Sequence, residues 1–376
     1  MGDPTDTERG EPAPTPSTGG RKKKKKKSKR VQARSSRGLR DLLPELQMER
    51  QRLIDGVRGV YERYGFSPLA TPAVEYLDVL LGAEPGDEAT SQIFTASNPE
   101  GEALGLRFDL TVPLARVVAQ HRDLSRPFRR YQVAQVWRGD KPDKGRYREF
   151  TQFDIDSVGA PSHLADVEIM AAMCDTLEVL EVGPYRVRFS SRTLLDSLLD
   201  FARIPRERDR EVFRVLDKLD KLGLEKVELE LSSGYVDASG SRIPGLGLEE
   251  AQVAKIRSFL TLGGDGRADV LGRLRDLFAS VDGAEAAIDG VEEISDRLAS
   301  LGYGDDRVAL DVSIARGLAY YTGPVFEAGL IDAPQFGTVF AGGRYDGLVK
   351  RFLGEAVPAV GASMGIDRLL AALEHL

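Results

Sequence analysis

The sequence has 376 residues, enough for one large domain with a smaller one or for two domains of ordinary size. Its hydrophobic share of 41% and charged share of 30% are typical of a soluble globular protein, and no window approaches the roughly 18 apolar residues of a membrane span. Cys174 is the only cysteine, which excludes an internal disulfide, and the three scattered histidines exclude a zinc-ligand spacing. A cytoplasmic setting is therefore expected.

The net charge of −7 is unevenly distributed. Residues 1–37 hold four acidic and twelve basic side chains, so this segment carries +8 and the remainder −15. The basic run at 21–30 lies among Pro, Ser, Thr and Gly, a composition that predicts a disordered tail. Such a tail either adds salt-sensitive affinity for nucleic acid or only improves solubility, and its composition does not decide between the two.

Ordered structure is expected from about residue 38. Residues 44–64 read as a helix, because Pro44 suits a first turn, apolar residues recur at helical spacing and Gly65 suits a helix end. A short extended segment is expected at 66–71. The segments 104–111, 148–156 and 308–315 each alternate apolar residues with small or polar ones, as a strand with two different faces does. The polar faces contain Asp, Gln, Thr and Ser but almost no lysine, which favours a lined cavity over a face in water.

The middle of the chain changes character. Residues 131–157 predict a long hairpin around the turn-rich run 139–145, followed by a helix at 165–180, a strand at 185–189 and a helix at 192–201. Residues 205–305 are rich in charged residues, and their apolar residues recur at helical spacing. This pattern predicts a mostly helical insertion that divides a strand-rich core. The expected domains are the tail 1–37, a first core segment 38–204, the insertion 205–305 and a second core segment 306–376.

The run from Trp137 to Phe150 carries the strongest chemical signal. It places several arginine and lysine side chains and an aromatic ring around one hairpin. A triphosphate needs forked donors and point charges, and a purine needs an apolar plate. Arginine also neutralises charge that develops on a phosphate under attack. A basic turn that simply faces water is the alternative for this run alone.

Two later runs are weaker signals by themselves. The run 315–327 has Arg316 before a glycine and then Tyr320 and Tyr321, although paired tyrosines are more often core residues. The runs 341–348 and 359–368 are rich in glycine, which lets a backbone approach a ligand or a neighbour closely. Arg368 begins a final helix, where a lone arginine is usually a surface charge.

Taken in order, these runs resemble the signatures of one family, the histidyl-tRNA synthetases of class II. The openings Gly38-Leu-Arg-Asp-Leu-Leu-Pro44 and Thr71-Pro-Ala-Val-Glu75 are similar to the N-terminal part and the dimer-forming first motif. The run 138–152 is similar to the second motif and 359–368 to the third. The runs 316–323 and 341–346 resemble signatures of the histidine enzymes. The resemblance implies an α+β fold with an antiparallel sheet flanked by helices, and a homodimer.

The resemblance also implies a reaction and its residues. Histidine and ATP, with Mg²⁺, would form histidyl-adenylate, and the histidyl group would pass to tRNA. Two arginines, Arg138 and Arg316, would act on the reacting phosphate. ATP would be held by Arg138, Arg146, Phe150 and Arg368. Histidine would be held by Asp109, Leu110, Thr111, Arg138, Gln152, Asp156, Arg316, Tyr320 and Tyr321.

Two features depart from the family pattern. Ala319 stands where the family usually has an aspartate. Only eight residues follow Arg368, where the synthetases are expected to continue into an anticodon-binding domain. A related protein without that domain is the histidine-sensing regulatory subunit of ATP phosphoribosyltransferase, whose partner is the catalytic subunit. The residues present in the motifs favour the synthetase, and the regulatory subunit is the alternative.

Overall fold

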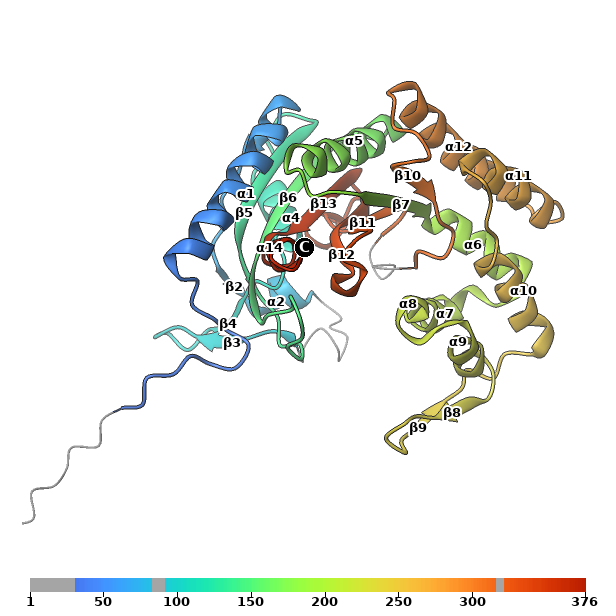
Figure 1. Cartoon of the computed structure of the whole chain (residues 1–376), viewed down its shortest axis with the longest axis horizontal. Coiled ribbons are helices and arrows are strands. Elements are labelled where there is room, and N and C mark those ends of the chain that lie inside the picture. Colours follow the sequence, from blue (N-terminus) through green and yellow to red (C-terminus); the bar gives the residue numbers. More distant parts are fainter. Residues whose placement is uncertain (1–30, 83–91, 316–320) are drawn as a thin grey trace, which may run out of the picture. The chain divides into compact units, whose positions relative to one another are not determined.

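The computed structural model describes residues 31–82, 92–315 and 321–376, and a mixed sheet of eight strands organises the fold (Figure 1). Neighbouring strands are antiparallel except for the two outermost pairs, which are parallel. The predicted antiparallel sheet is therefore confirmed, and so is the hairpin of its second and third strands. In spatial order the strands are β1 (Ser67–Pro68), β5 (Phe128–Trp137), β6 (Glu149–Val158), β13 (Ala359–Gly365), β12 (Thr338–Arg344), β11 (Pro324–Leu330), β7 (Tyr185–Ser191) and β10 (Val308–Leu310).

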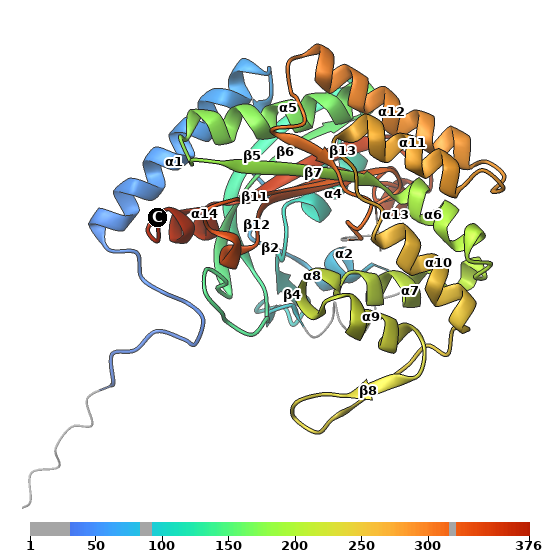
Figure 2. The ribbon, with the colours of Figure 1, turned by 45° about the vertical axis from the view of Figure 1, so that its right-hand side comes forward.

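Long helices cover the sheet on one side. Helix α5 (His163–Val179) contacts five of its strands, and α1 (Pro44–Arg63) and α12 (Ala284–Ser300) pack beside α5 (Figures 1 and 2). Helix α1 forms as predicted: it starts at a proline, buries Ile54, Val57 and Tyr61 at helical spacing, and ends before Gly65, whose φ is 78°. The last helix, α14 (Ile366–Leu373), contacts α1, β6 and β12.

A second, smaller layer contains a sheet of three strands, in the order β2 (Val74–Tyr76), β4 (Ala103–Leu106) and β3 (Thr95–Ser97). Helix α2 (Leu77–Leu81) packs against this sheet, α4 (Thr111–Gln120) packs against α2, and α13 (Lys350–Leu353) packs against α4. Leu80, Leu114 and Tyr345 belong to the apolar core of this layer.

The prediction of one strand over 104–111 was wrong in its second half. Strand β4 ends at Leu106, and helix α4 begins at Thr111. The Asp109 carboxylate accepts a hydrogen bond from the Val112 backbone N–H at 3.0 Å, which favours helix initiation over a further strand residue. Arg107 is buried because its guanidinium donates to the backbone carbonyls of Gln135, Thr71 and Pro72.

The segment 308–315 alternates in burial as predicted, but only its first residues form a strand. Val308, Leu310, Val312 and Ile314 are all buried, as the pattern predicts. The hydrogen-bonded strand β10 nevertheless ends at Leu310. The Asp311 carboxylate accepts hydrogen bonds from the backbone N–H and the hydroxyl of Ser313, a local turn that replaces the ladder.

Residues 205–305 contain mostly helices, with one short hairpin. The compact unit that contains them extends over residues 36–376. The proposed boundaries at 204 and 305 remain predictions, and the basic run at 21–30 lies outside the described residues. The elements after β7 are α6 (Arg192–Phe201), η1 (Arg206–Arg208), α7 (Asp209–Leu216), α8 (Leu219–Leu222), α9 (Leu224–Leu231), β8 (Gly234–Val236), β9 (Arg242–Pro244), α10 (Glu250–Leu260), α11 (Arg267–Leu277) and α12. None of the helices in the described ranges is long and apolar enough to span a bilayer.

Candidate active site

The side chains that the sequence pattern assigns to ATP converge on one cavity. It has a volume of about 540 Å³ and opens between the β5–β6 hairpin, the central strands and the start of α14. Three of the residues predicted to hold histidine also line it, and one of these, Arg138, is predicted to hold ATP as well. The predicted residues that line it are Arg138, Arg146, Phe150, Gln152, Tyr321 and Arg368.

The hairpin supplies one wall of this cavity, with positive charge beside an aromatic ring. The Arg138 guanidinium lies over the Phe150 ring, 5.2 Å from its centroid, and its Nε donates to the Phe108 carbonyl at 2.9 Å. Arg146 forms an ion pair with Asp140 and is half exposed. A guanidinium held over a ring and a second one at the mouth can contact both the phosphates and the base of a nucleotide.

The opposite wall comes from α14 and the strands β11 and β12. Arg368 donates from Nη1 to the Thr338 carbonyl at 2.7 Å, which turns the guanidinium toward the sheet. Glu327 also lines the cavity, pairs with Arg188 and accepts a hydrogen bond from the Thr338 hydroxyl at 2.9 Å. Arg368 is therefore part of the site rather than an isolated surface charge.

Sequence reasoning missed Glu327, Ser363 and Asp217 as lining residues. Glu327 had a signal, because it ends the run 315–327 that was singled out. Ser363 lies inside the third motif, in which only the glycines and Arg368 were predicted to have a role. Asp217 follows helix α7 in the segment predicted as an insertion, and nothing in the local pattern indicates that it reaches the cavity.

Strands β5 and β6 carry a buried cluster of charges, with Arg130 on β5 and Asp154 and Asp156 on β6. Arg130 is fully buried, and its Nη2 lies 2.6 Å from Asp156 Oδ2 and 3.9 Å from Asp154 Oδ2. Burial raises the pKa of both carboxyl groups, Arg130 opposes the rise, and the pKa of Asp154 reaches about 7. One arginine thus faces two carboxylates, and this imbalance favours a cationic ligand nearby.

The segment Asp109–Thr111 approaches the same region from the start of α4. It is not part of the cavity wall among the described residues, but Arg130 Nη2 donates to the Leu110 carbonyl at 3.1 Å. Burial raises the pKa of Asp109, while hydrogen bonds from the Val112 and Thr111 N–H groups and the charge of Arg138 oppose the rise. Asp109 therefore interacts electrostatically both with Arg138 and with Arg130 of the buried cluster.

Glycines in two motifs allow the strands around the cluster to approach each other. A Cβ at Gly361 would lie 1.9 Å from Asp156 Oδ1, and a Cβ at Gly342 would lie 2.1 Å from the Gly361 carbonyl oxygen. Either contact is far inside van der Waals distance. The prediction that these glycines permit a close approach is confirmed, and the neighbour that Gly361 accommodates is itself a predicted site residue.

Arg316, Ala319 and Tyr320 lie outside the described residues, so their predicted roles are not tested here. Tyr321, the next residue, is described and lines the cavity. Its ring also packs over Gly343, where a Cβ would lie 2.9 Å from Tyr321 Cδ1.

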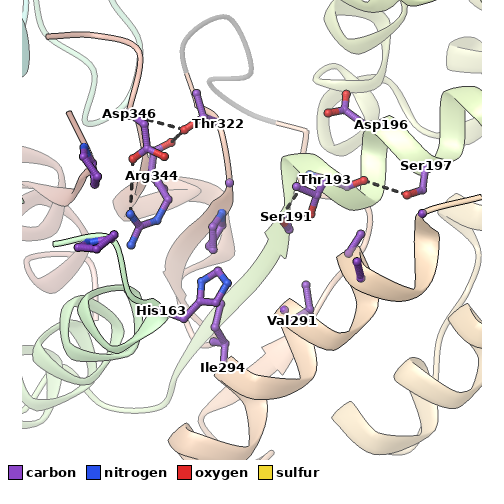
Figure 3. A pocket seen from close by; sticks show the side chains of 18 of the residues that line it. His163, Ser191, Thr193, Asp196, Ser197, Val291, Ile294, Thr322, Arg344 and Asp346 are labelled. Atoms are coloured by element: carbon purple, nitrogen blue, oxygen red, sulfur yellow. Dashed lines mark hydrogen bonds and ion pairs between the residues drawn. The ribbon is translucent and has the colours of Figure 1, made fainter. Parts of the chain in front are cut away.

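A second cavity, of about 590 Å³, lies between the N-terminal end of α5, helices α6 and α12, and the start of β11 (Figure 3). Its wall includes His163, Ser191, Asp196, Thr322 and Arg344. None of the described residues predicted to bind ATP or histidine lines it. Its volume is slightly larger than that of the first cavity, but its described lining contains none of the side chains assigned to the two substrates.

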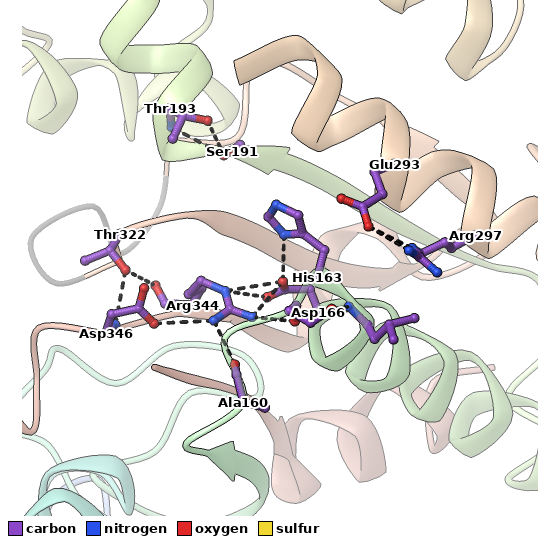
Figure 4. A network of polar contacts seen from close by, with 12 residues as sticks. Ala160, His163, Asp166, Ser191, Thr193, Glu293, Arg297, Thr322, Arg344 and Asp346 are labelled. Atoms are coloured by element: carbon purple, nitrogen blue, oxygen red, sulfur yellow. Dashed lines mark hydrogen bonds and ion pairs between the residues drawn. The ribbon is translucent and has the colours of Figure 1, made fainter. Parts of the chain in front are cut away.

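A polar network at this second cavity reaches Thr322, the residue that follows Tyr321 (Figure 4). Arg344 pairs with the buried Asp166 at 2.8 Å, and Asp166 also contacts the His163 ring at 3.1 Å. The Arg344 carbonyl accepts the Thr322 backbone N–H at 2.8 Å. The Thr322 hydroxyl accepts the Asp346 backbone N–H at 3.1 Å, so the network supports the chain beside Tyr321.

Comparisons with known proteins agree with this arrangement. The family model described as histidyl-tRNA synthetase matches residues 38–369. A histidine--tRNA ligase of Ruegeria pomeroyi is 44% identical over 92% of this chain and 73% of its own length.

Two solved structures are also similar. A histidyl-tRNA synthetase of Nostoc sp. PCC 7120 superposes with a TM-score of 0.79 at 33% identity, covering 92% of this chain and 76% of that one. A protein of Bacillus halodurans described as ATP phosphoribosyltransferase regulatory subunit/histidyl-tRNA synthetase gives a TM-score of 0.76 at 25% identity, covering 92% of this chain and 84% of that one. By its motifs, its fold and these matches, the chain belongs to the histidyl-tRNA synthetase family.

Proposed function

We propose that this chain is a histidine--tRNA ligase, which activates histidine with ATP and transfers it to tRNA. The observation that carries the proposal is the convergence of three arginines and the Phe150 ring in the 540 Å³ cavity, together with a buried acidic cluster on β6, the strand that supplies Gln152 to the cavity wall. One part of that surface suits a nucleoside triphosphate, and the other suits a small cationic ligand. Family membership supplies the identity of the two substrates.

For ATP, Phe150 offers a face for adenine. Arg138 is assigned to the α-phosphate and to the carboxylate of histidine, and Arg146 and Arg368 to the outer phosphates. We infer that Mg²⁺ enters with the nucleotide as MgATP, held largely by phosphate oxygens. Asp140 and Glu327 line the cavity and bring the one or two carboxylates that Mg²⁺ usually takes from a protein in such a setting.

For histidine, we assign Asp109 and Thr111 to the α-amino group, beside the Leu110 backbone. Gln152, Asp156, Tyr320 and Tyr321 are assigned to the imidazole side. Gln152 Oε1 is buried and receives no hydrogen bond from the described residues, so an N–H group of a ligand would satisfy it. A site that pairs a ring N–H strongly rejects amino acids without one, because its own polar groups are then left unpaired.

The chemistry proceeds in two steps. A carboxylate oxygen of histidine attacks the α-phosphorus of ATP, the bond to the bridging oxygen breaks, and pyrophosphate leaves. Arg138 and Arg316 are placed in the role of stabilising the charge that develops at the phosphorus. A terminal ribose hydroxyl of tRNA then attacks the carbonyl carbon of the adenylate, and AMP leaves.

We further infer a homodimer that works in the cytoplasm. Strand β2 forms an edge of the three-stranded sheet, and its Val74 and Tyr76 side chains are 40% and 51% exposed. An open edge with exposed apolar side chains favours pairing with a second copy. Sedimentation of the purified chain tests this inference: a species of twice the chain mass is expected, and a monomer at micromolar concentration would contradict it.

The basic run at 21–30 is proposed to add affinity for tRNA. Its lysines and arginines suit a phosphate backbone, and the added affinity would fall as salt rises. Deleting residues 1–30 should therefore raise KM for tRNA at low salt and leave adenylate formation unchanged. Equal KM values for tRNA with and without the tail would make it a solubility element.

The regulatory subunit of ATP phosphoribosyltransferase is the second candidate, because the Bacillus halodurans relative carries both descriptions. Charging of tRNA separates the two. The chain is mixed with histidine, ATP and a tRNA transcript of histidine specificity, and histidyl-tRNA is measured. Charging that needs ATP, and falls at least about 100-fold in Arg316→Ala, is the expected result. Histidine binding without charging, together with activation of the phosphoribosyltransferase catalytic subunit, would support the regulator instead.

A further inference from the structure

Gln152 faces the cavity with only one end of its amide group satisfied. Its Nε2 donates to the Ser363 hydroxyl oxygen at 2.5 Å across the β6–β13 pair. Its Oε1 is buried and lacks a hydrogen-bond donor among the described residues. The carbonyl end is therefore the one left for a ligand, and the orientation of the amide decides whether the site offers an acceptor or a donor.

Asp154 lies two residues further along β6, on the same face of the strand, directly opposite Ser363 in the ladder. Its side chain is 2% exposed, and the Ser363 hydroxyl on the opposite strand favours its ionised form, which lowers the pKa of Asp154 against the larger rise caused by burial. Asp154 Oδ1 is buried and has no hydrogen-bond donor in the described part of the chain. Arg130 lies closer to Asp156 than to Asp154, so it compensates Asp154 less directly.

The direction of these hydrogen bonds follows from what each group can do. In its ionised form Asp154 only accepts, so Ser363 then donates its single proton to the carboxylate. The Ser363 oxygen is then left as an acceptor, and it takes the N–H of Gln152. An amide at position 154 could instead donate to Ser363, which would free the serine proton for Gln152 Oε1 and reverse the amide.

We propose that Asp154 is a positioning residue for recognition of the amino acid. Through Ser363 it fixes Gln152 so that the carbonyl oxygen is presented to an N–H group of the bound substrate. This inference rests on the proposed function, since histidine is the substrate whose N–H groups would be read. Asp154 itself does not line the cavity, and its effect is transmitted through two side chains.

Kinetics of histidine-dependent pyrophosphate exchange test the relay. Asp154→Asn and Ser363→Ala should each raise KM for histidine about 10-fold, the effect of losing one hydrogen bond in a buried site. In Asp154→Asn, which changes a residue outside the cavity wall, kcat and KM for ATP should stay within about twofold of the wild-type values. Ser363→Thr keeps a hydroxyl and should restore KM for histidine, which a purely structural role of the serine would not predict.

The double variant Asp154→Asn/Ser363→Ala provides a second measurement. Since the two residues act in one relay, its KM for histidine should be close to that of the worse single variant, and the two effects should not multiply. An unchanged KM in Asp154→Asn, equal damage from Ser363→Ala and Ser363→Thr, or multiplying effects would each overturn the proposal. Absence of exchange in the wild-type chain would instead contradict the proposed function, so the two failures are distinguishable.

Discussion

Arg344 and Asp166 form a buried ion pair that joins the end of strand β12 to the first turn of helix α5. Arg344 Nη2 lies 2.8 Å from Asp166 Oδ2, and Arg344 Nε donates to Asp166 Oδ1 at 3.0 Å (Figure 4). Arg344 also donates to the carbonyls of Ala160 and Ser162, at 3.2 Å each. Successive strand residues point to opposite faces, so Arg344 anchors β12 on the side away from Tyr321, which packs over Gly343.

Breaking this pair should destabilise the fold. Asp166→Ala leaves the Arg344 guanidinium buried with only the more distant Asp346 carboxylate, 3.4 Å away, and the free energy of unfolding should fall by about 3 kcal/mol. Denaturant unfolding monitored by circular dichroism measures the change. The matched control is Glu293→Ala, which removes an ion pair with Arg297 whose two side chains are both 42% exposed and should cost less than about 1 kcal/mol. Equal losses in the two variants would contradict the assignment.

His163, which contacts Asp166, should add a small pH-dependent contribution to the free energy of unfolding. The hydrogen bond with Asp166 raises the pKa of His163, burial and Arg344 oppose the rise, and Glu293 adds to it. Because the folded pKa lies above the unfolded value of about 6.5, the stabilisation is complete below that pH and disappears as the pH rises through the folded pKa. The difference in the free energy of unfolding between wild type and His163→Gln should therefore shrink as the pH rises from about 5.5 to about 8.5. If this difference grows as the pH rises, the pKa of His163 is not raised by folding.

A side chain at Gly361 should disable the site. Gly361→Ala places a Cβ against the Asp156 carboxylate and the backbone of Ile155, so either the sheet or the acid must move. We expect loss of histidine-dependent activity by about 100-fold, the scale of a misplaced site, together with lower stability. Gly347→Ala is the control, because a Cβ there meets nothing within 4 Å. If both variants remain active, close packing at Gly361 is not required.

Removing the ring of Phe150 should affect ATP more than histidine. Base–aromatic stacking contributes about 1–3 kcal/mol, so Phe150→Ala should raise KM for ATP by about 10-fold or more. The same change also removes the surface over which Arg138 lies. Phe336→Ala is a comparison at a phenylalanine outside the cavity wall, near Gly145. A rise in KM for histidine alone would reassign Phe150 to the amino-acid side.

Local signals predicted the elements of this fold well, because most of them are determined by short-range patterns. Helix α6 was predicted at 192–201, its observed bounds, and the β5–β6 hairpin follows from two strand patterns around a turn-rich run. The strand at 104–111 failed because one carboxylate, Asp109, starts a helix through a hydrogen bond that alternation of apolar residues does not report.

The candidate site was predictable where its residues lie in motifs, and less so where they meet only in three dimensions. Arg138, Phe150 and Arg368 come from separate runs that the resemblance brings together. Asp217 reaches the cavity from a distant helical segment, and the pairing of Asp154 with Ser363 depends on the register of β6 and β13. Such register is a property of the whole sheet, and a single sequence does not specify it.

Histidine-dependent exchange of pyrophosphate into ATP tests the central claim most directly, because it reports adenylate formation without requiring tRNA. Purified chain is assayed with each of the common amino acids, beside Arg138→Ala. Exchange with histidine alone, reduced about 100-fold or more in the variant, is the predicted result. Exchange that is absent with histidine, or equally strong with other amino acids, would contradict the assignment of this cavity to histidine activation.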